Sequence, residues 1–194
     1  MGSKKMHGLV NRCIEAFLRN TYGSATWQQV AAEADVHPDG FLTWESSPDS
    51  ITHAIVLASA RRLDKSVGEL LEDVGAWLSR QKQIRRLLRF GGATFQEFVE
   101  SLRELPGRIH LVIPDLEFPG FTVLSDAPGR YRIIAEPHQP GLMRVLAGML
   151  RVMADDYGSL AVISVVRDRI DIDVVLPDYS SKRGFELSPK RAQI

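Results

Sequence analysis

Several features that are scarce in the sequence narrow the classes of protein to which it can belong. One cysteine in 194 residues allows no disulfide within the chain, so we expect a cytoplasmic compartment. No apolar run approaches the length that crosses a bilayer, and the first residues lack the apolar stretch of a signal peptide. Lysine plus arginine equals aspartate plus glutamate, at 24 each, which gives no general attraction for polyanions. We therefore predict a protein that does not span a membrane and does not bind nucleic acid.

The motifs of common catalytic chemistries are also missing. The sequence contains no Gly-x-Ser-x-Gly motif, no phosphate-binding loop, and no histidines or cysteines at the spacing of zinc ligands. Asp155 and Asp156 are adjacent, but they follow the apolar face of a predicted helix and are expected to face solvent. We predict that the chain is not an enzyme.

The first half of the chain has the apolar spacing of helices. Residues recur three and four apart, as expected when one face of each helix is buried, and Ser24 is the expected N-cap of the second helix. A Ser66-x-x-Glu69 capping box is expected to open the fourth. Pro106-Gly107 is expected to end the helical half. Helices are predicted over residues 8–20, 24–34, 47–65, 66–81, 84–90 and 94–105.

The second half mixes alternating and helical patterns. Alternation over 121–124 and 131–135 around a turn, and again over 160–166 and 170–176, predicts two hairpins. Between them, residues 141–157 have helical spacing. We predict an α+β fold, a single domain over residues 6–178, with a helical lobe over about 6–65 and a lobe with a small antiparallel sheet and helices over about 66–178. Residues 1–5 are predicted to be a tag or disordered, and residues 179–194 a polar tail.

Five short segments together resemble the signature segments of one known family, the haem-nitric oxide/oxygen binding (H-NOX) family, in order and approximate spacing. They are Met6-His7-Gly8-Leu9-Val10-Asn11, Thr26-Trp27, Gly91-Gly92 before Phe95-x-x-Phe98, Ile113-Pro114-Asp115-Leu116-x-x-Pro119-x-Phe121, and Pro140-Gly141-Leu142. The resemblance implies the H-NOX fold, in which a helical distal lobe and a proximal α+β lobe enclose a flat tetrapyrrole. It also implies a sensor in which a shift between the lobes is read by a signalling partner, such as a histidine kinase or a cyclic-dinucleotide enzyme.

The residues on which the family's haem chemistry depends are replaced in this sequence. The resemblance places the iron-ligating histidine of the family at Pro106, which has no donor atom for iron. It places the Tyr-x-Ser-x-Arg motif, which holds the haem propionates, at Ala135, Pro137 and Gln139. Pro119, which the resemblance places against the face of the cofactor, is retained. We therefore expect no haem cofactor.

An apolar cavity left empty would cost stability, so we predict that another apolar molecule, such as a fatty acid, occupies the former haem cavity. The domain would then be a haem-independent sensor that acts on a partner in trans. Arg108, His110 and Arg132 are the predicted contacts of an acidic head group. The predicted lining residues are Val10, Ile14, Leu78, Leu105, Pro106, Ile113, Pro119, Phe121, Leu142 and Leu146.

Two alternatives remain open from the sequence. In the first, the chain is a haem-binding NO or O2 sensor in which His110, one helical turn beyond Pro106, ligates the iron; the Pro106-Gly107 break argues against a helix that continues this far. In the second, larger side chains fill the cavity and the chain is a ligand-free interaction module. The basic stretch over residues 80–89 is expected to be a solvated helix face or a surface for a partner or anion, and Cys13 a small core residue.

Overall fold

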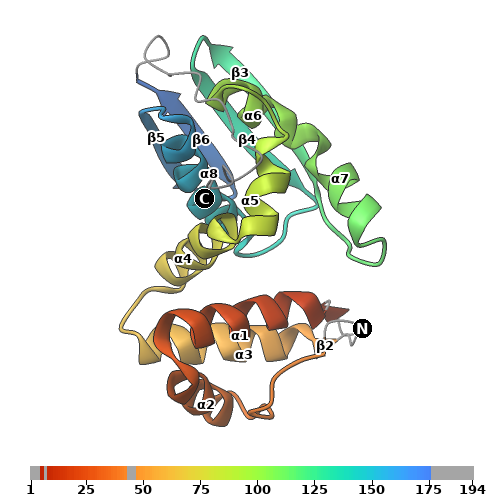
Figure 1. Ribbon diagram of the computed structural model, residues 1–194, viewed down its shortest axis with the longest axis vertical. Coiled ribbons are helices and arrows are strands. Elements are labelled where there is room, and N and C mark those ends of the chain that lie inside the picture. Colours follow the sequence, from red (N-terminus) through yellow and green to blue (C-terminus); the bar gives the residue numbers. More distant parts are fainter. Residues whose placement is uncertain (1–4, 7, 43–46, 176–194) are drawn as a thin grey trace, which may run out of the picture.

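The computed structural model describes residues 5, 6, 8–42 and 47–175, which form two lobes joined through one long helix (Figure 1). The distal lobe contains three helices and a two-residue ladder. Its elements are β1 (Lys5–Met6), α1 (Gly8–Tyr22), α2 (Ser24–Glu33), β2 (Ser47–Pro48) and α3 (Asp49–Arg62). The joining helix is α4 (Val67–Arg80). Lys5, which was predicted to precede the fold, pairs with Pro48 in the ladder.

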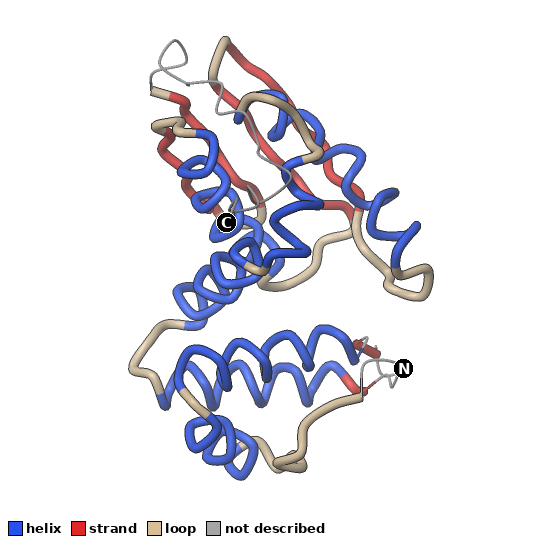
Figure 2. Tube along the Cα trace, in the orientation of Figure 1, coloured by secondary structure: helices blue, strands red, loops and turns tan. Residues whose placement is uncertain are grey.

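The proximal lobe combines short helices with a four-stranded sheet, as Figure 2 shows by its colouring of helices and strands. Its helical elements are α5 (Lys82–Arg89), α6 (Phe95–Ser101), the 3-10 turn η1 (Leu102–Glu104), α7 (Leu105–Val112) and α8 (Leu142–Tyr157). Its strands are β3 (Gly120–Ala127), β4 (Arg130–Glu136), β5 (Ala161–Val166) and β6 (Arg169–Val174). The predicted α+β class and both predicted hairpins are therefore confirmed.

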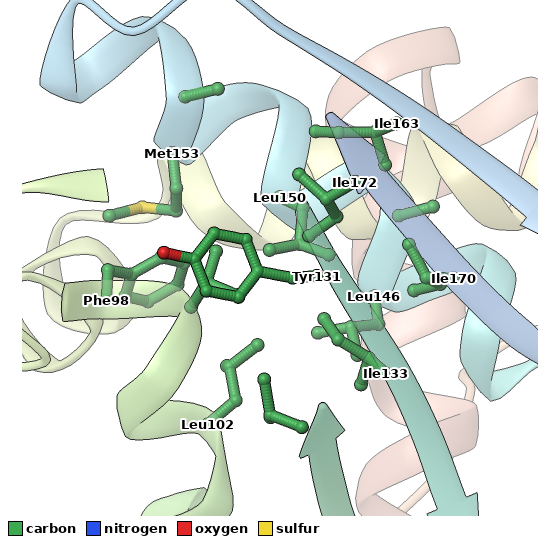
Figure 3. Packing of buried hydrophobic residues seen from close by; sticks show 14 of the residues in the cluster. Phe98, Leu102, Tyr131, Ile133, Leu146, Leu150, Met153, Ile163, Ile170 and Ile172 are labelled. Atoms are coloured by element: carbon green, nitrogen blue, oxygen red, sulfur yellow. The ribbon is translucent and has the colours of Figure 1, made fainter. Parts of the chain in front are cut away.

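The sheet is antiparallel with strand order β3-β4-β6-β5, and α8 lies across one face of it. Alternate residues of β4 point to that face, so Tyr131 and Ile133 are buried while Arg132 between them points to the opposite face. Figure 3 shows how these two residues pack against Leu146, Leu150 and Met153 of α8. This packing forms the larger of the two hydrophobic cores.

The distal lobe has its own core, made by the apolar faces of α1, α2 and α3. Phe17 and Trp27 are almost completely buried in it, and the Trp27 Nε1 donates a hydrogen bond to the Pro38 carbonyl at 2.8 Å. Leu70 and Val74 of α4 complete this core. Because these two residues lie within α4, one side of the joining helix is part of the distal core.

The backbones of α4 and α8 touch where the two helices cross. A Cβ added to Gly75 would lie 1.9 Å from the Val145 carbonyl oxygen, and one added to Gly148 would lie 1.9 Å from the Glu72 carbonyl oxygen. Only glycine permits so close an approach. The crossing thus holds α4 directly on the central helix of the proximal lobe.

Two helix N-caps were predicted from the sequence, and the structure confirms one of them. The capping box of α4 is confirmed, since the Ser66 side chain accepts from the Glu69 N–H and the Glu69 side chain accepts from the Ser66 N–H. The predicted Ser24 cap is wrong: Gly23 is the N-cap of α2, with φ 89°, and no side chain caps this helix. Glycine adopts that backbone conformation without the clash that a side chain would cause.

The predicted end of the helical half at Pro106-Gly107 is also wrong. After the η1 turn a new helix, α7, begins at Leu105 and contains Pro106 in its first turn. Proline is tolerated there because the first N–H groups of a helix have no partner within the helix in any case. Within the described residues, no helix is long and apolar enough to cross a bilayer.

Candidate functional site

Pro106 and Pro119 lie close to the proximal core. Pro106 is half-buried beside Leu105, which is itself buried in that core. Pro119 is buried at the entry to β3, next to Phe118 and Phe121, whose rings meet edge to face at 5.7 Å. The rings of Pro106 and Pro119 provide apolar surface and no donor for a metal or an anion.

The three positions that correspond to a propionate-binding motif have no hydroxyl and no cation. Ala135 is buried in the proximal core, opposite Phe121 in the sheet register. Pro137 is exposed and Gln139 half-buried in the segment between β4 and α8. These side chains cannot form the charge-assisted hydrogen bonds that hold carboxylates.

The predicted head-group contacts do not come together. Arg108 pairs with Glu104, the residue just before α7, at 2.6 Å, and His110 is exposed one turn beyond Pro106 on α7. Arg132 points away from the core and forms ion pairs with Asp126 at 3.1 Å and Asp171 at 3.5 Å. Each residue is thus in a separate environment.

The predicted lining residues divide between the two lobes. Val10, Ile14 and Leu78 belong to the distal core or pack against it. Leu105, Phe121, Leu142 and Leu146 belong to the proximal core or pack against it, and Ile113 is half-buried after α7. The structure has two open hollows on other parts of its surface, and the more apolar one shares only Leu78 with this set.

That hollow is a groove where α1 meets the end of α4 and the start of α5, and we call it the α1–α5 groove. It has a volume of about 490 Å³, is open to solvent and is mostly apolar. Its lining residues are Arg12, Cys13, Ala16, Trp77, Leu78, Gln81, Lys82, Gln83 and Ile84. A second open hollow, of about 360 Å³, is more polar and lies at the α3–α4 junction.

The rim of the α1–α5 groove is cationic because two guanidinium groups share one carboxylate as their ion-pair partner. Glu15 is completely buried and accepts from Arg12 at 2.6 Å and from Arg19 at 2.8 Å. This leaves an excess positive charge beside the groove, and Lys82 is exposed on the other side. Arg12 and Lys82 therefore suit an anion whose apolar part lies between them.

Cys13 contributes a neutral, weakly polar wall. Burial raises the pKa of the Cys13 thiol, so the thiolate is disfavoured at neutral pH. The expectation that Cys13 is a core residue is corrected by its half-buried position in the groove. Within the described residues, no group of three or more histidine, cysteine or acidic side chains is placed to hold a metal ion.

Sequence reasoning missed Glu15 and the residues that surround it. Besides the two arginines, Glu15 accepts from the Phe41 N–H at 3.1 Å, and Gly40 next to it has φ 93°. A Cβ at Gly40 would lie 2.0 Å from a Glu15 carboxylate oxygen. The available signal was the placing of Arg12 and Arg19 three residues before and four after Glu15, the spacings that bring charges together on a helix.

Asp156 is a second correction, since it was expected to face solvent. The Arg85 Nε donates to it at 2.6 Å, and its side chain is only 15% exposed. The partner comes from α5, so the spacing of residues within α8 gave no indication of the pair. Asp155, by contrast, is exposed as predicted.

Comparison with protein families gives one match that spans most of the chain. The family model described as HNOB, Haem-NO-binding, matches residues 7–165. Soluble guanylate cyclase gcy-31 of Caenorhabditis elegans is 22% identical over 171 residues, 87% of this chain and 24% of that protein. Soluble guanylate cyclase 89Db of Drosophila melanogaster is 18% identical over 158 residues, 80% of this chain and 24% of that protein. The chain thus spans about a quarter of the length of these relatives.

Solved structures with the same fold support this match. A Cs H-NOX mutant superimposes with a TM-score of 0.74 at 15% identity, covering 89% of this chain and 98% of that one. The Fe(II) unliganded H-NOX protein from K. algicida gives 0.72 at 14% identity, covering 87% and 96%. An oxygen-binding H-NOX domain related to soluble guanylate cyclases gives 0.68 at 15% identity, covering 92% and 100%.

Proposed function

The chain belongs to the haem-NO-binding (H-NOX) family, and we propose that it is a sensor domain that works without haem and responds to an apolar acid in the α1–α5 groove. The domain itself is not catalytic in this proposal. It passes the signal to a partner such as a histidine kinase or a cyclic-nucleotide or cyclic-dinucleotide enzyme. Two guanylate cyclases are among the proteins that match it in sequence.

The residues at the expected haem position do not fit a haem. Pro106 has no free lone pair to give to iron, and the neighbouring histidine, His110, is exposed on another part of α7. Ala135 takes the place of a propionate-holding hydroxyl and is packed in the proximal core. The residues at this position therefore supply neither a ligand for iron nor donors for the propionates, which supports a haem-independent role.

The observation that carries the proposal is the α1–α5 groove with its apolar walls and cationic rim. Trp77, Leu78 and Ile84 offer apolar surface to an acyl chain, at about 0.8 kcal/mol for each buried methylene. Arg12 and Lys82 offer donors to its carboxylate. A volume of about 490 Å³ is within the usual range for small-molecule sites.

The position of the groove explains how its ligand could act as a signal. Ala16 and Cys13 belong to α1 of the distal lobe, whereas Ile84 belongs to α5 and packs against the proximal core. A ligand that contacts both sides favours the arrangement of lobes in which these contacts are made. Occupancy then shifts the population of lobe arrangements, and a partner can read that shift.

Palmitate titration followed by tryptophan fluorescence tests the proposal, because Trp77 lines the groove. We expect palmitate to bind more tightly than hexadecanol. Lys82→Glu should lower the affinity for palmitate by about tenfold and leave the affinity for hexadecanol unchanged. Ala16→Trp should block both by filling the groove. Arg86→Glu on the same helix lies outside the groove and is the matched control.

If palmitate binds equally well to the wild type and a folded Ala16→Trp variant, the groove is not the site. If no apolar acid binds at all, and none is found in a lipid extract of the purified protein, the domain is a ligand-free interaction module. A Soret absorption band that is lost in His110→Ala would instead establish the haem-binding alternative.

A further inference from the structure

Helix α5 carries two adjacent rows of basic side chains on the side opposite the buried Leu88. The inward row is Arg85 and Arg89, and the outward row is Lys82, Arg86 and the aromatic residue Phe90 just after the helix. Within each row the residues are four apart, so their side chains lie one above the other. The two rows have different surroundings.

The inward row holds α5 on the end of α8. The Arg85 Nε and Nη2 donate to both carboxylate oxygens of Asp156, at 2.6 and 2.7 Å. The Arg89 guanidinium lies over the Tyr157 ring at 4.1 Å from its centroid and donates to the Asp156 carbonyl at 3.3 Å. Arg85 and Arg89 therefore have a structural role, which is to hold α5 against the end of α8.

The outward row has no such role. Lys82 and Arg86 are exposed, and neither they nor the nearby Arg80 form an ion pair with any carboxylate of the described residues. Phe90 is 77% exposed, an unusual state for a phenylalanine that continues a row of cations. The row is about 12 Å long, which matches two turns of a facing helix.

We propose that the outward row, with Arg80 beside it, is the docking surface for an acidic helical segment of the signalling partner. Carboxylates spaced four apart would meet Lys82 and Arg86, and an apolar residue at the next turn would cover Phe90. The inference rests on the proposed function only in that a sensor needs a partner; the docking contacts do not require the ligand.

The size and charge of the surface favour a protein partner over other polyanions. Non-specific binding to DNA depends on contacts between cations and many phosphates, and the chain, with a net charge of +0, offers only this short basic row among its described residues. Membrane docking needs a larger apolar face than one phenylalanine. An acidic helix is the occupant that fits both the cations and the ring.

Lys82 belongs both to the outward row and to the rim of the α1–α5 groove. A carboxylate bound in the groove would neutralise part of the charge that the partner uses. Ligand binding should therefore weaken docking, and by thermodynamic linkage the partner should weaken ligand binding by the same factor.

A synthetic amphipathic peptide tests the surface directly. The probe is a labelled, alanine-rich helix with glutamates four apart and a leucine one turn further along the same face. Binding is measured by fluorescence anisotropy at low salt and mapped on the full chain by amide chemical shifts. We expect Arg86→Glu to weaken binding by about tenfold and Phe90→Ala by about threefold.

Arg167→Glu is the matched control, since Arg167 is an exposed arginine on the β5–β6 turn, away from α5. All three variants replace exposed side chains, and their folding is checked by circular dichroism. Palmitate affinity should be unchanged in Arg86→Glu, so failure of the docking surface and failure of the ligand site give different results.

The proposal is overturned if Arg167→Glu weakens binding of the peptide as much as Arg86→Glu does. It is also overturned if the amides whose chemical shifts change on binding lie outside residues 80–90. It is equally overturned if phosphatidylserine vesicles or a short DNA duplex bind more tightly than the peptide in an Arg86-dependent way.

Discussion

Replacing Gly148 by alanine is expected to destabilise the protein, because the added methyl group would enter the backbone of α4. The new Cβ would lie 1.9 Å from the Glu72 carbonyl oxygen and 3.0 Å from the Ala76 nitrogen. Ordinary van der Waals contact begins at 3.4 Å. The two helices would have to separate by about 1.5 Å at the crossing to accept it.

Two opposing effects set the magnitude. Alanine in place of a helical glycine gains about 1 kcal/mol of helix propensity. Overpacking costs about 1–3 kcal/mol, and here the cost lies at the upper end or beyond, since the obstacle is backbone and cannot rotate away. Glu72 is also tied to Arg144 at 2.9 Å and Arg151 at 2.6 Å, so α4 is restrained at this place. We expect a net loss of about 2 kcal/mol.

Urea unfolding followed by circular dichroism measures this loss. Gly107→Ala is the matched control, because Gly107 is also in a helix and a Cβ there would meet nothing within 4 Å. With no clash, it should stabilise the protein by up to about 1 kcal/mol. If Gly148→Ala proves as stable as Gly107→Ala, the close crossing of α4 and α8 is not how the lobes are joined.

Three further predictions concern the groove and the lost haem site. Glu15→Ala should destabilise the protein by about 2 kcal/mol in urea unfolding, because Arg12, Arg19 and the Phe41 N–H lose their shared acceptor; a change under 0.5 kcal/mol would contradict this. Because burial raises the pKa of the Cys13 thiol, less thiolate forms at pH 8 than in a free thiol. Alkylation of Cys13 by iodoacetamide, followed by mass spectrometry, should therefore be slow, become faster at higher pH and become slower still when palmitate occupies the groove. An alkylation rate equal to that of free cysteine would refute this prediction. Pro106→His combined with Ala135→Tyr, Pro137→Ser and Gln139→Arg should give no stable Soret band, since residue 135 lies in the proximal core; acquisition of haem would mean that only the ligands, and not the cavity, have changed.

Local signals in the sequence were sufficient for most of the fold. The Ser66–Glu69 capping box and the period-two alternation of β3 and β4 each depend on residues close together in the chain. The wrong prediction that the helical half ends at Pro106 also came from a local signal. The rule that proline ends a helix applies to helix interiors, and nothing in the neighbouring residues indicated that a second helix starts one residue earlier.

The site was harder to predict because it depends on how helices cross. Arg12 and Cys13 on α1 meet Trp77 on α4 only through the packing of the distal core, and no periodicity within either helix encodes that meeting. The resemblance placed lining residues in both lobes, and in the structure these residues pack into or against two separate cores. The pairing of Asp156 with Arg85 was missed for the same reason.

The position of α4 between the two cores has a consequence for how the chain can be cut and recombined. A fragment that ended at residue 65, before this helix, would lack Leu70 and Val74 and would expose the apolar faces of α1 and α3 to water. A fragment that began there would carry those same leucine and valine side chains without their partners. The two lobes are therefore not interchangeable modules. Because α4 also crosses α8 at Gly75 and Gly148, a chimaera with a related domain that is joined on either side of α4 would break one of the two packings of this helix.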